Sequence, residues 1–416
     1  MFKNKIFLPA FIFVLMSQIA FGQNNTNSPY TRFGFGDISD TNPGELRAMG
    51  GLAFGSRANT SINTANPASY SAVDSMTFMF DVGVSALGSR FSEVAGYTHK
   101  FNANLEYITM QIPLWKKVGF SAGLLPYSFS GYNFYSSSDL SYELFPDTVT
   151  QTQYFNGVGG INQVYSGISL NLFDHISLGV NAYYMFGSSI NTRQLTFSAS
   201  DFYPSYQQDS ITINSFRFRY GLQFYNTFAK KHDVTLGLVY EAKTKLNATY
   251  SEMTGSVEAD ATEYQDVFTK FEVPEMYGVG LNYTYNKQLT VGVDYSLQKW
   301  GEAQYFGVTD SLANRSKFVL GAEFIPNPRS RKYLDQIHYR AGVNLSDPYY
   351  KINNITQPKN IGITFGVGLP LKNSNTLINT TFEYGKIGTS GLLREDYFKL
   401  TFNAVFNENW FFKRKL

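Results

Sequence analysis

The chain has 416 residues, of which 16% are charged and 17% aromatic, with a formal net charge of +2 and no cysteine. The balanced charge excludes a strongly basic surface for nucleic acid, and the aromatic content excludes a disordered chain. The absence of cysteine excludes disulfides and lipoprotein processing. This composition favours an outer-membrane β-barrel over a periplasmic or secreted β-sandwich or repeat protein.

The first 22 residues have the pattern of a secretory signal peptide. Lys3 and Lys5 form a positive start, residues 6–19 are mostly apolar, and small residues precede a predicted cleavage before Gln23. An N-terminal membrane anchor is the alternative, but the apolar run is too short to span a bilayer and a polar segment follows it. We therefore expect an exported protein.

Residues 23–75 precede the first predicted strand and contain many Gly, Asn and Pro residues. The segment is too long for a tail and too apolar for a free linker. Since a wide barrel leaves a lumen that its own side chains cannot fill, it needs an occluder unless it is an open pore. We expect residues 23–75 to form a hatch that plugs the lumen. A periplasmic extension that never enters the barrel is the alternative.

Residues 76–416 show the alternation of a transmembrane β-barrel. Such strands need roughly 9–11 residues, with apolar side chains facing lipid at every second position. The last strand shows this at Phe398, Leu400, Phe402, Ala404 and Phe406. Asn403 is expected to face the lumen, so Asn403→Arg should be tolerated better than Phe402→Arg. Short turns alternate with longer polar connections along the chain, which favours a barrel over a soluble sandwich.

The turns and loops predict fourteen strands, an even number that places both ends of the barrel in the periplasm. The predicted spans are 76–88, 100–113, 117–135, 161–173, 176–190, 213–228, 233–249, 267–285, 288–300, 315–325, 335–346, 360–370, 375–387 and 395–412. We therefore predict an all-β fold, a 14-stranded antiparallel transmembrane β-barrel with an N-terminal hatch. The expected location is the outer membrane of a Gram-negative (diderm) bacterium.

Several motifs, in order along the chain, resemble the FadL family of outer-membrane transporters for long-chain fatty acids and other hydrophobic molecules. They are Arg47–Ala53, Val273–Leu281, Gly366–Leu371, Phe382–Gly385 and the family's NPA hatch motif at Asn66, Pro67 and Ala68. The resemblance covers essentially the whole mature chain. It implies a fourteen-stranded barrel with an N-terminal hatch, which agrees with the strand count. The tail Asn409–Leu416 resembles the version found in Bacteroidota.

Two functions follow from the resemblance. The first is passive uptake of hydrophobic, fatty-acid-like molecules by loop capture, lumenal binding and lateral release. The Bacteroidota branch also includes barrels that bind partner proteins, among them a subunit of the type IX secretion system. The alternative is therefore a non-transporting subunit of an outer-membrane secretion or assembly complex. An apolar, ligand-sized cavity would favour the first function, and a filled lumen would favour the second.

Candidate site residues lie in the third strand and in two loops. Pro126 cannot donate a ladder hydrogen bond, so a bulge or kink is expected there. The resemblance implies a lateral gate in this strand, for which Pro126 and Gly123 are the candidates. The alternative is that Pro126 lies at the membrane surface, where pairing ends. The candidates for ligand capture, which ordinary loop packing explains equally well, are Leu144, Phe145, Phe202 and Tyr203.

The sequence contains no recognisable catalytic or metal-binding arrangement. Its four His residues are not grouped with an acid and a nucleophile, and no metal-ligand spacing or nucleotide motif occurs. We expect no enzymatic activity, no metal and no cofactor. The expected partners are outer-membrane lipid and lipopolysaccharide, a hydrophobic small-molecule ligand, and other outer-membrane proteins in a complex.

Overall fold

The computed structural model describes residues 25–40, 42–93, 96–140, 149–199, 201–256, 259–265, 270–352, 355–372, 375–388 and 393–409. In this part of the chain, fourteen antiparallel strands form a closed barrel, which confirms the predicted fold. They are β2 (Thr77–Glu93), β3 (Gly96–Trp115), β4 (Val118–Leu140), β5 (Val149–Leu172), β6 (Ile176–Phe197), β7 (Ser205–Phe228), β8 (His232–Glu241), β13 (Met276–Tyr285), β14 (Leu289–Gln298), β15 (Arg315–Phe324), β16 (His338–Ser346), β19 (Asn360–Pro370), β20 (Leu377–Gly388) and β21 (Arg394–Asn409). The predicted signal peptide lies outside the described residues.

Shorter elements lie between these strands and before them. Within the described ranges, no helix is long and apolar enough to cross a membrane. The shorter elements are η1 (Pro29–Arg32), β1 (Asp37–Ile38), α2 (Gly44–Arg47), η2 (Pro67–Ala72), β9 (Thr244–Lys245), β10 (Ala248–Ser256), β11 (Ala259–Gln265), β12 (Glu272–Val273), η3 (Trp300–Glu302), η4 (Tyr333–Gln336), β17 (Lys351–Ile352) and β18 (Ile355–Thr356).

The first and last barrel strands pair along their length, from Thr77 opposite Asn409 to Ser92 opposite Arg394. Successive side chains of a strand point to opposite faces of the sheet. In β21, Phe402 lies on the exposed outer face, while its neighbour Asn403 is buried inside the barrel. The facing predicted for this strand is therefore correct.

Tight turns join the strands at one end of the barrel. At Phe173–Asp174, Ala229–Lys230 and Asn286–Lys287 both residues have positive φ. This mirror-image turn geometry matches the right-handed twist of paired strands. Since short turns mark the periplasmic side of outer-membrane barrels, the opposite end faces outward.

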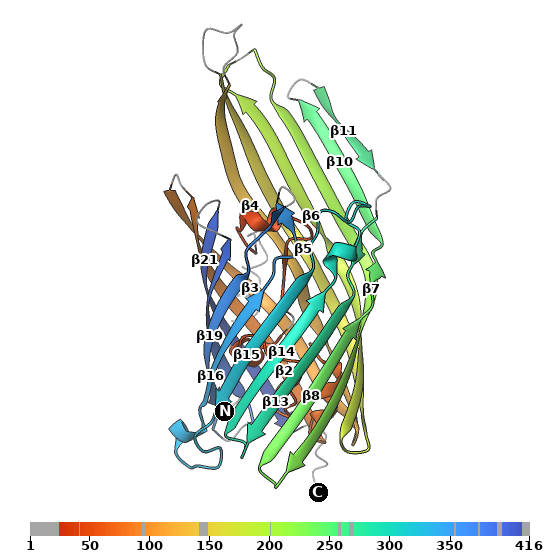
Figure 1. Ribbon diagram of the computed structural model, residues 1–416, viewed down its shortest axis with the longest axis vertical. Helices are drawn as coiled ribbons and strands as arrows, with labels where there is room; N and C mark the ends of the chain where they lie inside the picture. Colours follow the sequence, from red (N-terminus) through yellow and green to blue (C-terminus); the bar gives the residue numbers. More distant parts are fainter. Residues whose placement is uncertain are drawn as a thin grey trace, which may run out of the picture.

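One side of the barrel rises far beyond the other at the outer end (Figure 1). β4 and β5 have 23 and 24 residues, whereas β13 and β14 have 10 each. At roughly 3.3 Å per residue, the difference corresponds to about 45 Å of additional strand. β10 pairs with β7, and β11 pairs with β10, so they widen this side. We call the outer parts of β4 to β7, with β10 and β11, the raised wall.

The raised wall corrects the predicted connections 136–160, 191–212 and 250–265. These segments are strand over most of their length, because β4 to β7, β10 and β11 continue through them. Their sequences are polar, and a sheet that leaves the membrane no longer needs an apolar face toward lipid. Without that alternation, the pattern used to find transmembrane strands does not detect them.

Residues 25–75, which we call the hatch segment, lie against the inner face of the barrel. Helix η2 contacts β4, β5, β6 and β7, and α2 contacts β19, β20 and β21 on the other side. Several apolar side chains of the segment are fully buried, namely Leu46, Leu52, Ile62, Ala68 and Tyr70. The segment therefore packs into the barrel as a core.

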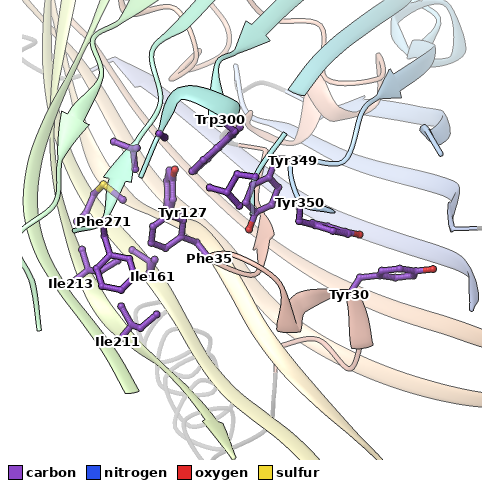
Figure 2. Close-up of a cluster of buried hydrophobic side chains, with 14 residues drawn as sticks. Tyr30, Phe35, Tyr127, Ile161, Ile211, Ile213, Phe271, Trp300, Tyr349 and Tyr350 are labelled. Atoms are coloured by element: carbon purple, nitrogen blue, oxygen red, sulfur yellow. The ribbon is translucent and has the colours of Figure 1, made fainter. Parts of the chain in front are cut away.

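An aromatic layer surrounds the start of the hatch segment in the outer half of the barrel (Figure 2). The ring of Trp300 lies 4.8 Å from Tyr349 and 5.8 Å from Phe35, measured between centroids. Gly34 has a φ of +60°, and a Cβ there would lie 2.8 Å from the Tyr349 ring, so only glycine fits. The other buried members of the layer are Tyr30, Tyr127, Ile161, Met185, Ile211, Ile213, Phe271, Val273, Ala303, Leu312 and Tyr350.

Candidate functional site

The NPA motif begins helix η2 at the inner face of the wall. The Asn66 side chain accepts a hydrogen bond from the Ala68 N–H at 3.1 Å and donates one to the Phe54 carbonyl oxygen at 2.8 Å. Pro67 is the first residue of η2, where its missing N–H leaves no helical hydrogen bond unmade. The three residues thus fix the fold of the hatch segment locally; that the segment plugs the lumen remains a prediction.

Glycines of the barrel strands let the hatch segment approach closely. A Cβ on Gly237 of β8 would overlap the Phe54 carbonyl oxygen, and a Cβ on Gly221 of β7 would overlap the Asn66 side chain. Only a residue without a side chain allows backbone to come so near. The alternation of the strands carries no signal for what these glycines contact.

Gly237→Val should destabilise the barrel, because the added side chain would push into the backbone of the hatch segment. Overpacking of this kind typically costs about 1–3 kcal/mol, so the folded, fast-migrating band should convert at a lower temperature in a heat-modifiability assay. Gly88→Val is the matched control, since a Cβ there would lie 3.9 Å from its nearest neighbour, the Phe398 carbonyl oxygen. Equal conversion temperatures for the two variants would contradict the close contact.

A buried ion-pair cluster joins the hatch segment to the wall. Arg47 of α2 donates to Glu106 of β3 at 2.7 Å, and Lys399 of β21 lies 2.6 Å from the other carboxylate oxygen. The Glu106 side chain is fully buried. A buried charge is tolerated only when partners compensate it, so the cluster ties α2 to two strands at once.

Further polar contacts fix the segment on the opposite side. Asp294 of β14 accepts hydrogen bonds from the backbone N–H groups of Ala53 and Phe54, at 2.6 and 2.8 Å. Lys317 of β15 lies 2.6 Å from Asp40. Removal from bulk water would raise the pKa of Asp40, but the positive charges of Lys317 and Arg315 hold it at about 2. Asp40 is therefore ionised at neutral pH.

Deleting residues 25–75 should raise single-channel conductance in planar bilayers, because these contacts would be replaced by water. The deletion must first be shown to give a heat-modifiable barrel. An unchanged conductance in a folded deletion variant would mean that the hatch segment does not close the lumen.

The ladder between β3 and β4 ends partway up the wall. The last pair is Ile108 opposite Leu124; beyond it, in the described residues, β3 and β4 are not paired with each other. β4 has a bulge between Pro126 and Ser128, at the point where the sequence suggested a bulge or kink. Gly123 lies just below, opposite Thr109 in the last rungs. A gating role for Pro126 and Gly123 remains a prediction.

The start of the hatch segment bridges this gap from the inside. The Asn104 side chain of β3 donates to the carbonyl oxygen of Asn25 at 2.6 Å. On the other side, β1 pairs with β4, with Asp37 opposite Phe129. A two-residue strand is too short to give a periodic signal, so this contact was not predictable from the sequence.

A cavity of about 180 Å³ lies between the hatch segment and the wall beside this gap. Pockets for small molecules usually measure about 300–1,000 Å³ and are mostly apolar. This cavity is smaller, and ionisable groups of both signs line it. They include Asp37, Asp40, Arg47, Arg315, Lys317, Asp347, Glu383, Glu395 and Lys399.

A second ionic cluster marks a break in the barrel wall. Arg217 and Arg219 of β7 both donate to Glu241, the last residue of β8. Here the β7–β8 ladder stops, and pairing resumes at Ile213 opposite Ala248 of β10. The predicted continuous strand 233–249 is therefore wrong, since the chain leaves the ladder after Glu241. The next predicted strand, 267–285, begins only at Met276.

Two of the four candidate capture residues lie in the part of the chain that the structure describes. Phe202 and Tyr203 lie in the connection between β6 and β7, beyond Phe197, whose ring is 5.1 Å from that of Phe202. Tyr203 is 62% exposed. Leu144 and Phe145 lie outside the described residues. In the described ranges, no group of three His, Cys, Asp or Glu side chains could hold a metal ion.

Comparisons with known proteins agree on the architecture. A family profile described as BamG matches residues 1–416. A search of curated proteins found no match. Among solved structures, a Pseudomonas aeruginosa FadL homologue is 12% identical, with a TM-score of 0.58, and the match covers 90% of this chain and 99% of that chain.

Two similar structures have substrates in their names. The P. putida toluene transporter TodX is 13% identical, with a TM-score of 0.57 and coverage of 89% of this chain and 99% of that chain. The Ralstonia pickettii toluene transporter TbuX is 14% identical, with a TM-score of 0.54 and coverage of 88% and 97%. At such identities the likeness shows the fold, so the FadL-like barrel is confirmed at that level. The fold places the protein in the outer membrane of a Gram-negative bacterium.

Proposed function

We propose, since the chain belongs to the BamG family, that it is a partner-binding subunit of an outer-membrane secretion or assembly complex. The observation that carries this proposal is the interior of the barrel. Ion pairs tie the hatch segment to the wall, and the cavity beside the wall gap is small and charged. A hydrophobic solute gains about 25 cal/mol per Å² in apolar surroundings, and this cavity does not offer such a lining.

The raised wall is the surface that we propose for partner proteins. On its outer face Tyr135 and Tyr154 are 68% and 46% exposed, with their ring centroids 6.0 Å apart. Tyrosine is enriched among the residues that dominate protein–protein binding. Beyond Gly131, whose N–H donates to Thr31 of the hatch segment, the described part of β4 has no partner in β3, and an unpaired edge can accept an added strand.

Mild-detergent purification of the tagged protein, expressed from its own locus, tests this proposal. The wild type should elute as a large complex with partners in fixed ratio. A Tyr135→Ser, Tyr154→Ser double variant should lose them while remaining heat-modifiable. Tyr97→Ser is the matched control, because Tyr97 is 65% exposed at the tip of the β2–β3 hairpin. Elution of the wild type as a lone barrel in several mild detergents would contradict the proposal.

A second candidate function is passive passage of hydrophobic small molecules. The gap between β3 and β4 favours it, and several proteins with this fold are named as toluene or monoaromatic hydrocarbon transporters or channels. The steps would be capture on the outer loops, binding in the lumen and lateral release beside Pro126. Residues 25–39 would then have to move away from the gap that they bridge.

A disulfide lock separates the two functions. Asp37 and Phe129 are paired across antiparallel strands, where Cα atoms lie about 4.5–5.5 Å apart, within the range of disulfides. Asp37→Cys with Phe129→Cys should therefore cross-link on oxidation, without interference because the chain has no native cysteine. Under our proposal, uptake of toluene should be the same in wild-type, locked and deletion strains. Uptake that needs the protein and is lost in the locked form would favour transport.

A further inference from the structure

A second cavity opens at the outer mouth of the barrel, at the foot of the raised wall. Its volume is about 430 Å³, which falls in the usual range of about 300–1,000 Å³ for small-molecule sites. Tyr132 and Phe155 of the raised wall line one side, and Arg32 and Phe33 of the hatch segment line another. Tyr305 and Phe306, which follow η3, add aromatic surface.

The charge of this cavity is unbalanced. Arg32, Arg193 and Lys351 line it together with one carboxylate, Asp209, so three cations less one anion leave an excess of two positive charges. Asp209 already accepts a hydrogen bond from the Tyr250 hydroxyl at 2.9 Å. The cavity is therefore suited to an anion.

The two arginines line the same cavity, and neither has an acidic partner among the described residues. The Arg32 guanidinium lies 4.3 Å from the centre of the Phe155 ring. Among the described residues, neither the Arg32 nor the Arg193 side chain forms an ion pair or a hydrogen bond. Burial lowers the pKa of Arg32, Tyr132 partly offsets this, and the nearby charge of Arg193 lowers it again. Two like charges in one cavity repel each other, and a bound anion would offset this repulsion.

We propose that this cavity binds a phosphate monoester carried on a sugar ring. A phosphate monoester has a charge of about −1.5 to −2 at neutral pH, which matches the excess of two positive charges better than a single carboxylate does. Arginine binds phosphate through two parallel N–H groups. The volume exceeds what one phosphate needs, and the aromatic walls can pack against a ring. The ligand could be a free sugar phosphate or the head group of an outer-leaflet glycolipid, and the site does not depend on the proposed function.

Isothermal titration calorimetry on the purified full-length barrel tests the proposal. The ligands are glucose 1-phosphate, glucose, inorganic phosphate, decanoate and monophosphoryl lipid A, all in the same detergent. We expect glucose 1-phosphate to bind and glucose not to bind, with inorganic phosphate and decanoate at least about tenfold weaker. If monophosphoryl lipid A also binds, the head group of a glycolipid is a source of the ligand. If it does not bind, the ligand is a soluble sugar phosphate.

Two arginine variants locate the site. Arg193→Gln and Arg32→Gln should each weaken binding of glucose 1-phosphate by about tenfold or more, the usual effect of losing a hydrogen bond to a charged group. Arg193 is exposed, so its replacement should leave the fold intact even if the Arg32 variant fails to fold. Arg90→Gln is the control, since Arg90 lies near the tip of the β2–β3 hairpin, outside this cavity. Lack of glucose 1-phosphate binding, equal binding of glucose or decanoate, or unchanged binding by Arg193→Gln would overturn the proposal.

Discussion

Glu106→Ala should lower the free energy of unfolding by about 3–5 kcal/mol, the usual cost of leaving buried charges without their partner. Glu106 is fully buried and compensates both Arg47 and Lys399, at 2.7 and 2.6 Å. Its loss would leave two cations facing each other inside the barrel. The measurement is urea unfolding of the refolded protein in detergent, followed by loss of the fast-migrating band.

An exposed ion pair provides the control for this variant. Lys117 and Asp174 lie 2.7 Å apart at the periplasmic turns, but their side chains are 53% and 75% exposed. Such surface pairs contribute about 0–1 kcal/mol, so Asp174→Ala should have little effect. If both variants unfold at the same urea concentration, the ion pairs of the hatch segment do not hold it in place.

Phe402→Arg should impair barrel assembly. Phe402 is 46% exposed on the outer face of β21, and arginine near the middle of the bilayer costs about 2–4 kcal/mol, falling to about 0–1 kcal/mol near the interfaces. Phe406→Arg on the same face is the control, because it lies closer to the periplasmic end of the strand. The assay is heat-modifiable migration of protein extracted from membranes, and equal assembly of the two variants would contradict the depth assigned to Phe402.

Asn403, the inward neighbour of Phe402, shows what alternation in the sequence does not predict. Alternation correctly placed Asn403 inside the barrel, and Asn403→Arg is expected to be tolerated better than Phe402→Arg. Asn403 is 3% exposed, donates to Asp81 at 3.0 Å and lies against Gly44 of the hatch segment. That expectation remains a prediction, and these contacts leave little room for a larger side chain at Asn403. Alternation reports which face a residue occupies, and it does not report what fills that face.

The sequence predicted the parts of the fold that follow a repeating pattern. The number of strands, their facing and most periplasmic turns come from period-two alternation and turn spacing. The break after Glu241 and the pairing of Asp37 with Phe129 depend on single contacts between distant segments. Such contacts leave no periodic trace in the chain.

The candidate site was predictable to a similar extent. The missing N–H of Pro126 pointed to an irregular strand, and β4 has its bulge there. The charged lining of the neighbouring cavity comes from residues spread from Asp37 to Lys399, which only the closed barrel brings together. Phe202 and Tyr203 were grouped with this site because they were assigned to a loop, and the length of β6 carries that connection away from it. The Bacteroidota affinity suggested by the tail remains a prediction.

The most direct test of the account is the complex formed by a barrel whose hatch segment cannot move. The Asp37→Cys, Phe129→Cys variant, cross-linked by oxidation in cells, would be purified in mild detergent beside the wild type. If the barrel acts as a fixed platform, the locked form should retain the same partners in the same ratio and support normal growth. A locked barrel that keeps its partners but loses its cellular function until the disulfide is reduced would contradict the account and identify movement of the hatch segment as the function.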